Sequence, residues 1–112
     1  MTRLPSSLIA AGLVKRAESE GGFGMVLAKG DAQAGSILVI LNEKGRNQGI
    51  LERILQSDGG YKWQSVGGQV AEEPAEFEAL LSRRKRFDPD IWLIELDVAS
   101  AERFAAEMNF DD

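Results

Sequence analysis

The first part of the chain places apolar residues at the spacing of a helix. Five of them recur every three or four positions and form one apolar stripe: Ile9, Ala10, Leu13, Val14 and Ala17. Pro5 suits the first turn of a helix, and Gly21-Gly22 ends it because glycine reaches left-handed geometry at little cost. We therefore expect a helix over about residues 5–20.

A second helix is predicted over about 74–86. Pro74 suits its first turn, acidic residues gather at its start, and the basic run Arg83–Arg86 lies at its end. This charge order complements the helix dipole. Further on, Ser100 is a suitable N-cap for a final helix in which Phe104 and Met108 share a face.

The remaining apolar runs are short and are bounded by glycine, proline or polar residues, which is typical of strands. Five strands are predicted: Phe23–Ala28, Ile37–Leu41, Ile50–Leu55, Tyr61–Val66 and Ile91–Leu96. Polar or glycine-containing connections separate them: Lys29–Ser36, Asn42–Gln48, Gln56–Gly60, Gly67–Glu73 and Asp88–Asp90. The run Ile37–Leu41 has no polar residue and predicts a central strand buried on both faces.

These elements predict an α+β fold in the order α-β-β-β-β-α-β-α. Short connections between the first four strands favour an antiparallel β-meander of about four strands, joined by a fifth strand. Each main helix has a single apolar stripe, so we expect both helices to pack on one face of the sheet. A short C-terminal helix completes the fold.

At 112 residues the chain has the usual length of one domain, so we expect a single domain over 1–112. It contains no cysteine and no histidine, which excludes disulfides, thiolate nucleophiles, Cys/His zinc sites and His-based triads. The sequence predicts no cofactor.

The net charge of −5 is spread unevenly. Residues 1–70 hold 8 basic and 6 acidic side chains, a net charge of +2, whereas residues 71–112 hold 5 and 12, a net charge of −7. An acidic C-terminal part disfavours nucleic-acid binding. The N-terminus lacks a signal-peptide pattern, no apolar run could span a bilayer, and cysteine is absent, so we expect a cytoplasmic protein without membrane contact.

The loop Gly30–Gly35 is the first candidate site, since glycines let a backbone approach a ligand and Asp31 adds one hard oxygen. A phosphate-binding loop would add a lysine and open a helix, and a calcium loop would need more acidic residues. The alternative that the composition favours is a hairpin connection shaped by Gly and Asp.

Two arginines fall on the apolar sides of the predicted helices. On a helical wheel Arg84 lies between Leu80 and Leu81, and Arg16 lies beside Ile9. Their stems could cover apolar surface while the guanidinium groups reach water. The alternative is an ion pair with a carboxylate of the sheet, for which Glu95 and Asp90 are the candidates.

Acidic residues supply the other candidates. Glu95 interrupts an apolar strand, so it either faces solvent or is partly buried and needs a partner. Asp88 and Asp90 flank Pro89 and could hold a magnesium ion together, although such a pair more commonly forms a turn.

Two aromatic residues, Tyr61 and Trp63, lie on one face of the predicted fourth strand. Core packing is the usual role of such residues, but on an uncovered face they would mark a partner surface. The basic run Arg83–Arg86 points all round its helix, and helix-end complementarity explains it without nucleic acid.

Two stretches, 30–35 followed by an aliphatic strand and 86–96, resemble a small family of alphaproteobacterial proteins known as domain of unknown function 1491 (DUF1491). The segments 6–16 and 20–23 fit the same family. The resemblance covers nearly the whole chain. It implies an α+β fold in a one-domain protein and implies no activity.

Three functions remain open. The first is a non-enzymatic protein-interaction module that uses an exposed aromatic strand or a sheet edge, with a partner protein or with itself. The second is an enzyme or binder for a small anionic ligand, with or without magnesium, which requires the aspartates and arginines to converge in one cleft. The third is nucleic-acid binding, against which the net charge argues.

Overall fold

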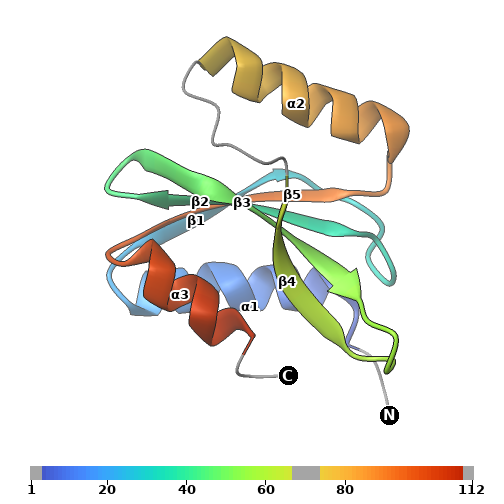
Figure 1. The fold of residues 1–112 in the computed structure, drawn as a ribbon, viewed down its shortest axis with the longest axis horizontal. Coiled ribbons are helices and arrows are strands. Elements are labelled where there is room, and N and C mark those ends of the chain that lie inside the picture. Colours follow the sequence, from blue (N-terminus) through green and yellow to red (C-terminus); the bar gives the residue numbers. More distant parts are fainter. Residues whose placement is uncertain (1–3, 67–73, 110–112) are drawn as a thin grey trace.

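The computed structural model describes residues 4–66 and 74–109, which form eight helices and strands in the predicted order (Figure 1). Their bounds are α1 Ser6–Ser19, β1 Phe23–Ala28, β2 Ile37–Glu43, β3 Arg46–Leu55, β4 Tyr61–Val66, α2 Pro74–Phe87, β5 Trp92–Val98 and α3 Ala101–Met108. The α+β class and the element order are confirmed. The link predicted over 67–73 lies outside the described residues.

The helices begin and end where the sequence signals lie. Pro5 is extended and precedes the first residue of α1, and Gly21 follows that helix with a φ of 89°. The Ser100 hydroxyl accepts a hydrogen bond from the Arg103 N–H at 3.4 Å and caps α3. Local chemistry therefore sets these boundaries.

The polar connection predicted over Asn42–Gln48 is wrong, because most of it belongs to strands β2 and β3. Only Lys44 and Gly45 form the turn, with φ of 50° and 82°. Two consecutive residues of positive φ match the twist of a tight hairpin. Polar residues can continue the ladder here because this end of the sheet is accessible to water.

The sheet has the strand order β1-β5-β2-β3-β4. β5 lies between β1 and β2, antiparallel to β1 and parallel to β2. The sheet is therefore mixed, and the antiparallel meander contains the three strands β2 to β4 rather than four. β2 is buried on both faces over Ile37–Leu41, as predicted. Its neighbour β5 is buried over Trp92–Ile94, and then carries the half-buried Glu95 and Asp97 on alternate positions.

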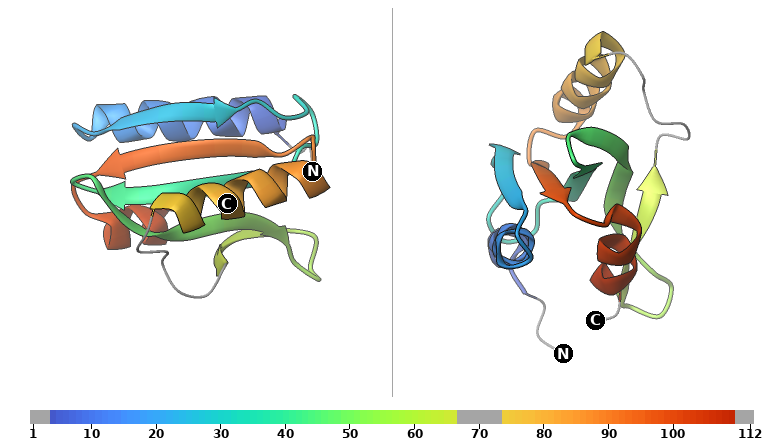
Figure 2. Two further views of the ribbon diagram at one scale, coloured as in Figure 1. Left: turned by 90° about the horizontal axis from the view of Figure 1, so that it is seen from above. Right: turned by 90° about the vertical axis from the view of Figure 1, so that its left-hand side faces the viewer.

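Helices cover both faces of the sheet (Figures 1 and 2). α1 and α3 pack on one face and α2 packs on the other, so the expectation that both main helices share a face is wrong. Buried apolar residues of β2, and of β5 at its start, lie on both faces of the sheet, so each face needs a cover there. In the view from above, α2 runs over β2 and β3 and leaves β1 and the adjoining part of β5 uncovered (Figure 2).

Within the part of the chain that the structure describes, no helix combines the length and the apolar character needed to cross a lipid bilayer.

Candidate functional site

Arg16 of α1 is held by two glutamates. Its Nη2 lies 2.8 Å from Oε1 of Glu107 in α3, and its Nε lies 3.3 Å from Oε2 of Glu20. The guanidinium carbon also lies 4.4 Å from the centroid of the Phe104 ring, which adds a cation–π contact. Arg16 therefore fastens α1 to α3.

Arg84 of α2 lies on the opposite face of the sheet. Its Nη2 lies 2.9 Å from Oε2 of Glu52 in β3, and both side chains are partly buried. Each arginine thus pairs with a carboxylate. The partners are Glu107 and Glu52, and not the expected Glu95 or Asp90. Because the sheet separates Arg16 from Arg84, the two guanidinium groups do not share a site.

The glycine-rich loop packs against the turn that precedes β5. Since β5 lies between β1 and β2, this loop passes the start of β5 and does not close the predicted hairpin. A Cβ on Gly30 or Gly35 would overlap the carbonyl oxygen of Asp90, so both positions require glycine. The Asp31 N–H donates to that oxygen at 3.0 Å, and Nε1–H of Trp92 donates to the Asp31 carbonyl at 2.8 Å. The two stretches that carry the sequence resemblance therefore meet in one structural junction.

Three candidate aspartates lie at this junction, and two of their side chains serve local turns. Oδ2 of Asp31 accepts hydrogen bonds from the N–H groups of Gln33 and Ala34, at 3.2 and 2.9 Å. Oδ1 of Asp88 accepts from the Asp90 N–H at 3.2 Å. The guanidinium groups of the two arginines are bound elsewhere, and no cluster of three or more metal-ligating side chains occurs among the residues described. The junction has the chemistry of turn formation.

Tyr61 and Trp63 share a face of β4, but that face is covered. Trp63 is buried in the core cluster beneath α3. The Arg53 guanidinium stacks on Tyr61, with its carbon 3.8 Å from the ring centroid. The exposed aromatic surface considered for this strand is therefore wrong at Trp63.

The outer edge of β4 is closed at Trp63 by the side chain of Asn109, which directly follows α3. The Asn109 amide accepts a hydrogen bond from the Trp63 N–H at 2.8 Å and donates one to the Trp63 carbonyl at 3.2 Å. The amide thus takes the place of a neighbouring strand. An edge so occupied cannot accept another strand at that residue.

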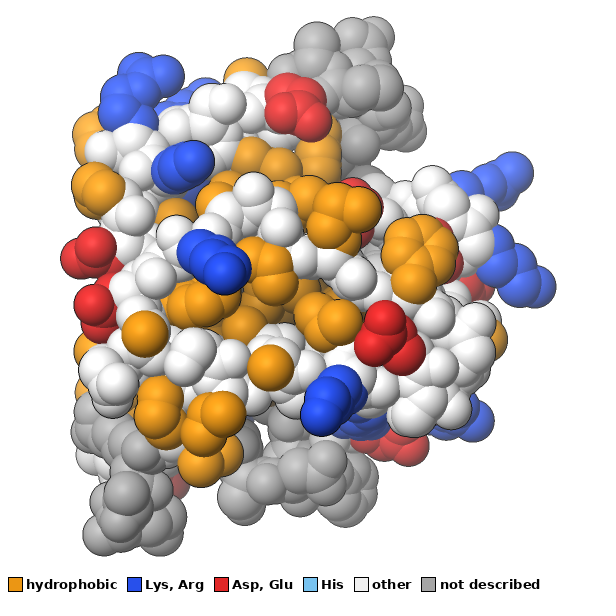
Figure 3. Space-filling view, turned by 180° about the vertical axis from the view of Figure 1, so that it is seen from behind, with side chains coloured by type: hydrophobic (Ala, Val, Ile, Leu, Met, Phe, Trp, Pro, Cys, Tyr) orange, Lys and Arg blue, Asp and Glu red, His pale blue; other side chains and the backbone are white. Residues whose placement is uncertain are grey.

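The opposite edge of the sheet, β1, carries exposed apolar side chains. Phe23 and Met25 are each 54% exposed and Leu27 is 43% exposed. Phe23 and Met25 lie on the face that carries α2, because the alternate residues Gly24 and Val26 face α1. Figure 3 shows hydrophobic side chains gathered across the middle of the side that carries β1 and α1.

Glu95 adjoins this apolar row. It is opposite Met25 in the antiparallel β1–β5 pair and beside Ile40 in the parallel β5–β2 pair, so it lies on the same uncovered face. Its side chain is half-buried. Among the described residues, none forms a hydrogen bond or an ion pair with its carboxylate. We call Phe23, Met25, Leu27 and Glu95 together the β1 surface.

Sequence reasoning singled out Glu95 but missed the three apolar residues of β1. The alternation of Phe23, Gly24, Met25 and Val26 is a signal of a strand with two different faces. Which face is left bare depends on where α2 crosses the sheet, and the apolar stripe of α2 does not specify that position.

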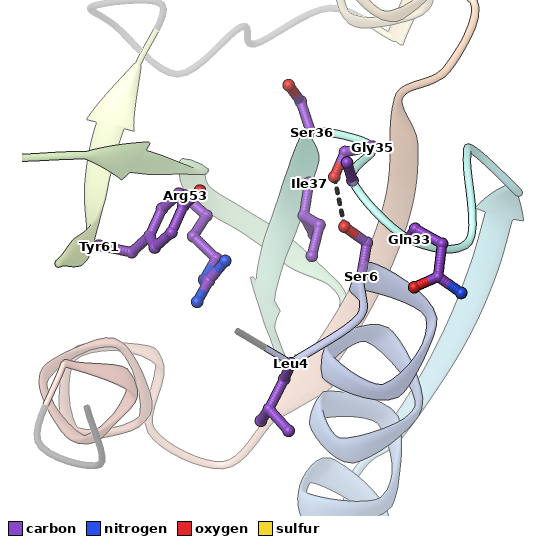
Figure 4. Close-up of a pocket in the computed structure, with 9 residues that line it drawn as sticks. Leu4, Ser6, Gln33, Gly35, Ser36, Ile37, Arg53 and Tyr61 are labelled. Atoms are coloured by element: carbon purple, nitrogen blue, oxygen red, sulfur yellow. Dashed lines mark hydrogen bonds between the residues drawn. The ribbon is translucent and has the colours of Figure 1, made fainter. Parts of the chain in front are cut away.

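A small pocket lies on the face of the sheet that carries α1 and α3. It is situated between the start of α1 and the residues that flank the β3–β4 turn (Figure 4). Arg53 and Tyr61 contribute polar groups to it, and Leu4 and Ile37 contribute apolar ones (Figure 4). Its volume of about 140 Å³ is well below the usual size of a ligand pocket, roughly 300–1,000 Å³. A wider hollow of about 430 Å³ beside α3 is lined by side chains of mixed character, such as Glu43, Leu51 and Ala105. Neither hollow brings the candidate aspartates and arginines together.

Comparison with known proteins gives a family and no activity. A family model described as "Protein of unknown function (DUF1491)" matches residues 4–106. The crystal structure of a DUF1491 family protein from Caulobacter crescentus CB15 is 29% identical with a TM-score of 0.76, over 91% of this chain and 94% of that chain. The NMR structure of a DUF1491 family protein from the same organism is 31% identical with a TM-score of 0.74, over 93% and 94%.

A solution structure of a protein from A. tumefaciens is similar to the same extent, with 27% identity and a TM-score of 0.75 over 93% of each chain. No curated protein matches the sequence. The similarity therefore extends over the whole fold and brings no substrate, cofactor or partner with it.

Proposed function

The chain belongs to the DUF1491 family, proteins of unknown function, and from the unequal protection of its two sheet edges we propose that it is a protein-interaction module. Its binding site is the β1 surface, and its ligand is an extended segment of a partner protein that adds a strand to β1.

The observation that carries this proposal is the contrast between the edges. At β4 the Asn109 amide occupies the outward backbone groups of Trp63. β1 is the other edge strand, and apolar side chains flank it. Proteins normally protect an edge strand with charges, a β-bulge or a covering segment. The register of β1 is interrupted between Val26 and Ala28, whereas residues 23–26 pair regularly, and the exposed apolar side chains of this regular part make a surface suited to a partner.

Strand addition also fits the chemistry of the β1 surface. Alternate residues of an edge strand point their N–H and C=O groups away from the sheet, and an added strand pairs with them. The exposed side chains of Phe23 and Met25 would then contact alternate side chains of the added segment. Backbone pairing supplies affinity and the side chains supply selectivity.

The alternative, a carboxylate- and arginine-based enzyme or a binder of a small anionic ligand, has less support. It requires Arg16 or Arg84 beside the aspartates of the junction. The two guanidinium groups instead pair with glutamates on opposite faces of the sheet. The pocket beside Arg53 is too small for an ordinary substrate or cofactor.

The test is selection of peptides that bind the protein. A displayed library of short random peptides is panned against the wild-type protein, and enriched peptides are titrated by NMR. We expect shift changes at the amides of residues 23–28 and a loss of affinity of about tenfold or more in Met25→Asp. Leu55→Asp is the matched control, since Leu55 is exposed at the far end of β3, and it should bind as wild type does.

Failure to enrich any peptide, or equal affinity of the enriched peptides for Met25→Asp and wild type, would overturn the proposal. Met25 is exposed, so Met25→Asp should keep the wild-type circular dichroism spectrum, and a loss of binding can then be assigned to the surface.

A further inference from the structure

The β1 surface contains one charged group, and its surroundings indicate what kind of partner it would select. Glu95 lies between Met25 and Ile40 in the sheet register and is half-buried there. A carboxylate that is partly removed from water by apolar neighbours gains most from a cation that completes its hydrogen bonds. No described residue supplies that cation.

We infer that the segment bound at β1 carries a lysine or arginine opposite Met25, and that this side chain reaches across Met25 to the Glu95 carboxylate. This inference rests on the function proposed above and specifies the partner of the same site: an extended, apolar segment with one basic residue.

The geometry of a sheet permits this contact. An added strand would lie about 4.8 Å beyond β1, and therefore about 10 Å from β5. Directly opposite residues in antiparallel strands project to the same face, so a side chain opposite Met25 projects to the face that holds Glu95. A lysine or arginine extended along the sheet and a glutamate extended toward it can span this separation, with the apolar stem packed on Met25.

The electrostatic surroundings favour a cation as well. Asp97, two residues along β5, projects to the same face, where its Oδ2 accepts a hydrogen bond from the Gly45 N–H at 2.8 Å. The whole chain has a net charge of −5. A basic segment would therefore be attracted to this surface over a longer range than the contact itself.

A second copy of the chain fits the site less well. The exposed side chains of β1 are apolar, so a paired copy of β1 would bring no cation to Glu95. In a two-fold antiparallel pairing centred on Met25, the nearest basic residue of the second copy would be Lys29, which lies beyond the end of β1 and past the register shift between Val26 and Ala28. Lys29 is four positions from Met25, roughly 13 Å in an extended chain. The carboxylate would stay unpaired.

The test uses the peptides enriched on the wild-type protein. We expect them to share a lysine or arginine at one position among alternating apolar residues. Glu95→Gln should weaken their binding by about 10- to 100-fold, the usual effect of losing a hydrogen-bonded charge partner. Glu102→Gln in α3 removes the same charge from an exposed site on the other face and should leave affinity unchanged.

Charge reversal separates a direct contact from a general charge effect. A peptide in which the basic residue is replaced by glutamate should bind wild type poorly and should recover affinity for Glu95→Arg. Peptides that require Met25 but lack a basic residue, and that bind Glu95→Gln as tightly as wild type, would overturn this inference and leave the proposed function intact.

Self-association would overturn the inference in another way. Sizing measurements that show a dimer in the wild type and a monomer in Met25→Asp would make the occupant of β1 a second copy. A wild-type protein that stays monomeric, together with the charge-reversal result, is the outcome that supports a basic partner segment.

Discussion

Gly30 and Gly35 both face the carbonyl oxygen of Asp90, and neither position has room for a Cβ. The turn before β5 can therefore run directly against the loop that follows β1, and the Asp31 N–H can reach Asp90 at 3.0 Å. The glycines have a structural reason at these two positions: they let two backbones touch. The glycine-rich composition of this loop resembles that of a ligand-binding loop. Here it permits a contact between two backbone segments inside the protein.

Gly30→Ala is expected to lower the free energy of unfolding by about 1–3 kcal/mol or more, because the added methyl group displaces backbone. Gly12→Ala is the control. Gly12 lies in α1 with no atom within 4 Å of its Cβ position, so alanine there should raise the free energy of unfolding by about 0.5–1 kcal/mol. Urea denaturation of both variants checks this. A Gly30→Ala protein as stable as wild type would show that the junction can relax around the methyl group.

The arginines show how far single positions can be interpreted from sequence. Helical spacing correctly placed Arg16 and Arg84 beside apolar surface, and both form ion pairs. The partners could not be predicted, because Glu107 and Glu52 are 91 and 32 positions away and become neighbours only through the packing of helices.

Among the elements, β4 and α3 are linked by a side chain that acts as a strand. The Asn109 amide follows the last residue of α3 and pairs with both backbone groups of Trp63. The C-terminal end of a helix thereby protects the edge of a sheet. The same two hydrogen bonds hold the end of α3 against β4, whose Trp63 lies beneath this helix.

Asn109→Ala should free the Trp63 N–H and C=O at the sheet edge. We expect a loss of about 1–2 kcal/mol in stability, faster hydrogen exchange of the Trp63 amide, and association that increases with concentration. Gln64→Ala, on the exposed side of β4, is the control and should change none of these. Unchanged exchange at Trp63 in Asn109→Ala would mean that water or another group already serves this edge.

The elements themselves were predictable, and their arrangement in the sheet was not. Apolar runs, glycines and the Ser100 cap predicted every helix and strand of the described chain in the correct order. The position of β5 between β1 and β2 was missed, because a loop of the composition of Lys29–Ser36 suits a hairpin as well as a crossing past a third strand. The position at which α2 crosses the sheet was missed as well, because the apolar stripe of a helix does not specify it. The uncovered part of that face, which contains the β1 surface, was therefore not predicted.

Across the molecule, the two layers of core are unequal. The cluster beneath α1 and α3 contains both tryptophans and the fully buried Phe104, whereas the cluster beneath α2 is smaller. We therefore expect most of the stability to come from the α1–α3 face. α2 covers less of its face and leaves room beside β1 for a partner.

Phe104→Ala is expected to cost about 3–5 kcal/mol, since it removes a fully buried ring from the larger cluster. Phe87→Ala is the matched control, because Phe87 is 79% exposed at the end of α2 and should change stability by less than about 0.5 kcal/mol. Chemical denaturation, followed by the fluorescence of the two tryptophans, compares them. Equal losses in the two variants would contradict this account of the core.

The insertion of β5 between β1 and β2 has a consequence for the growing chain on the ribosome. β2, β3 and β4 are joined by short turns and can pair with one another as soon as they emerge. β1 and α1 emerge first but have no strand to join until the residues of β5, some seventy positions later, have been made. β1, the strand that we propose binds a partner, is thus also the strand with the longest delay between its own synthesis and that of β5, with which it pairs.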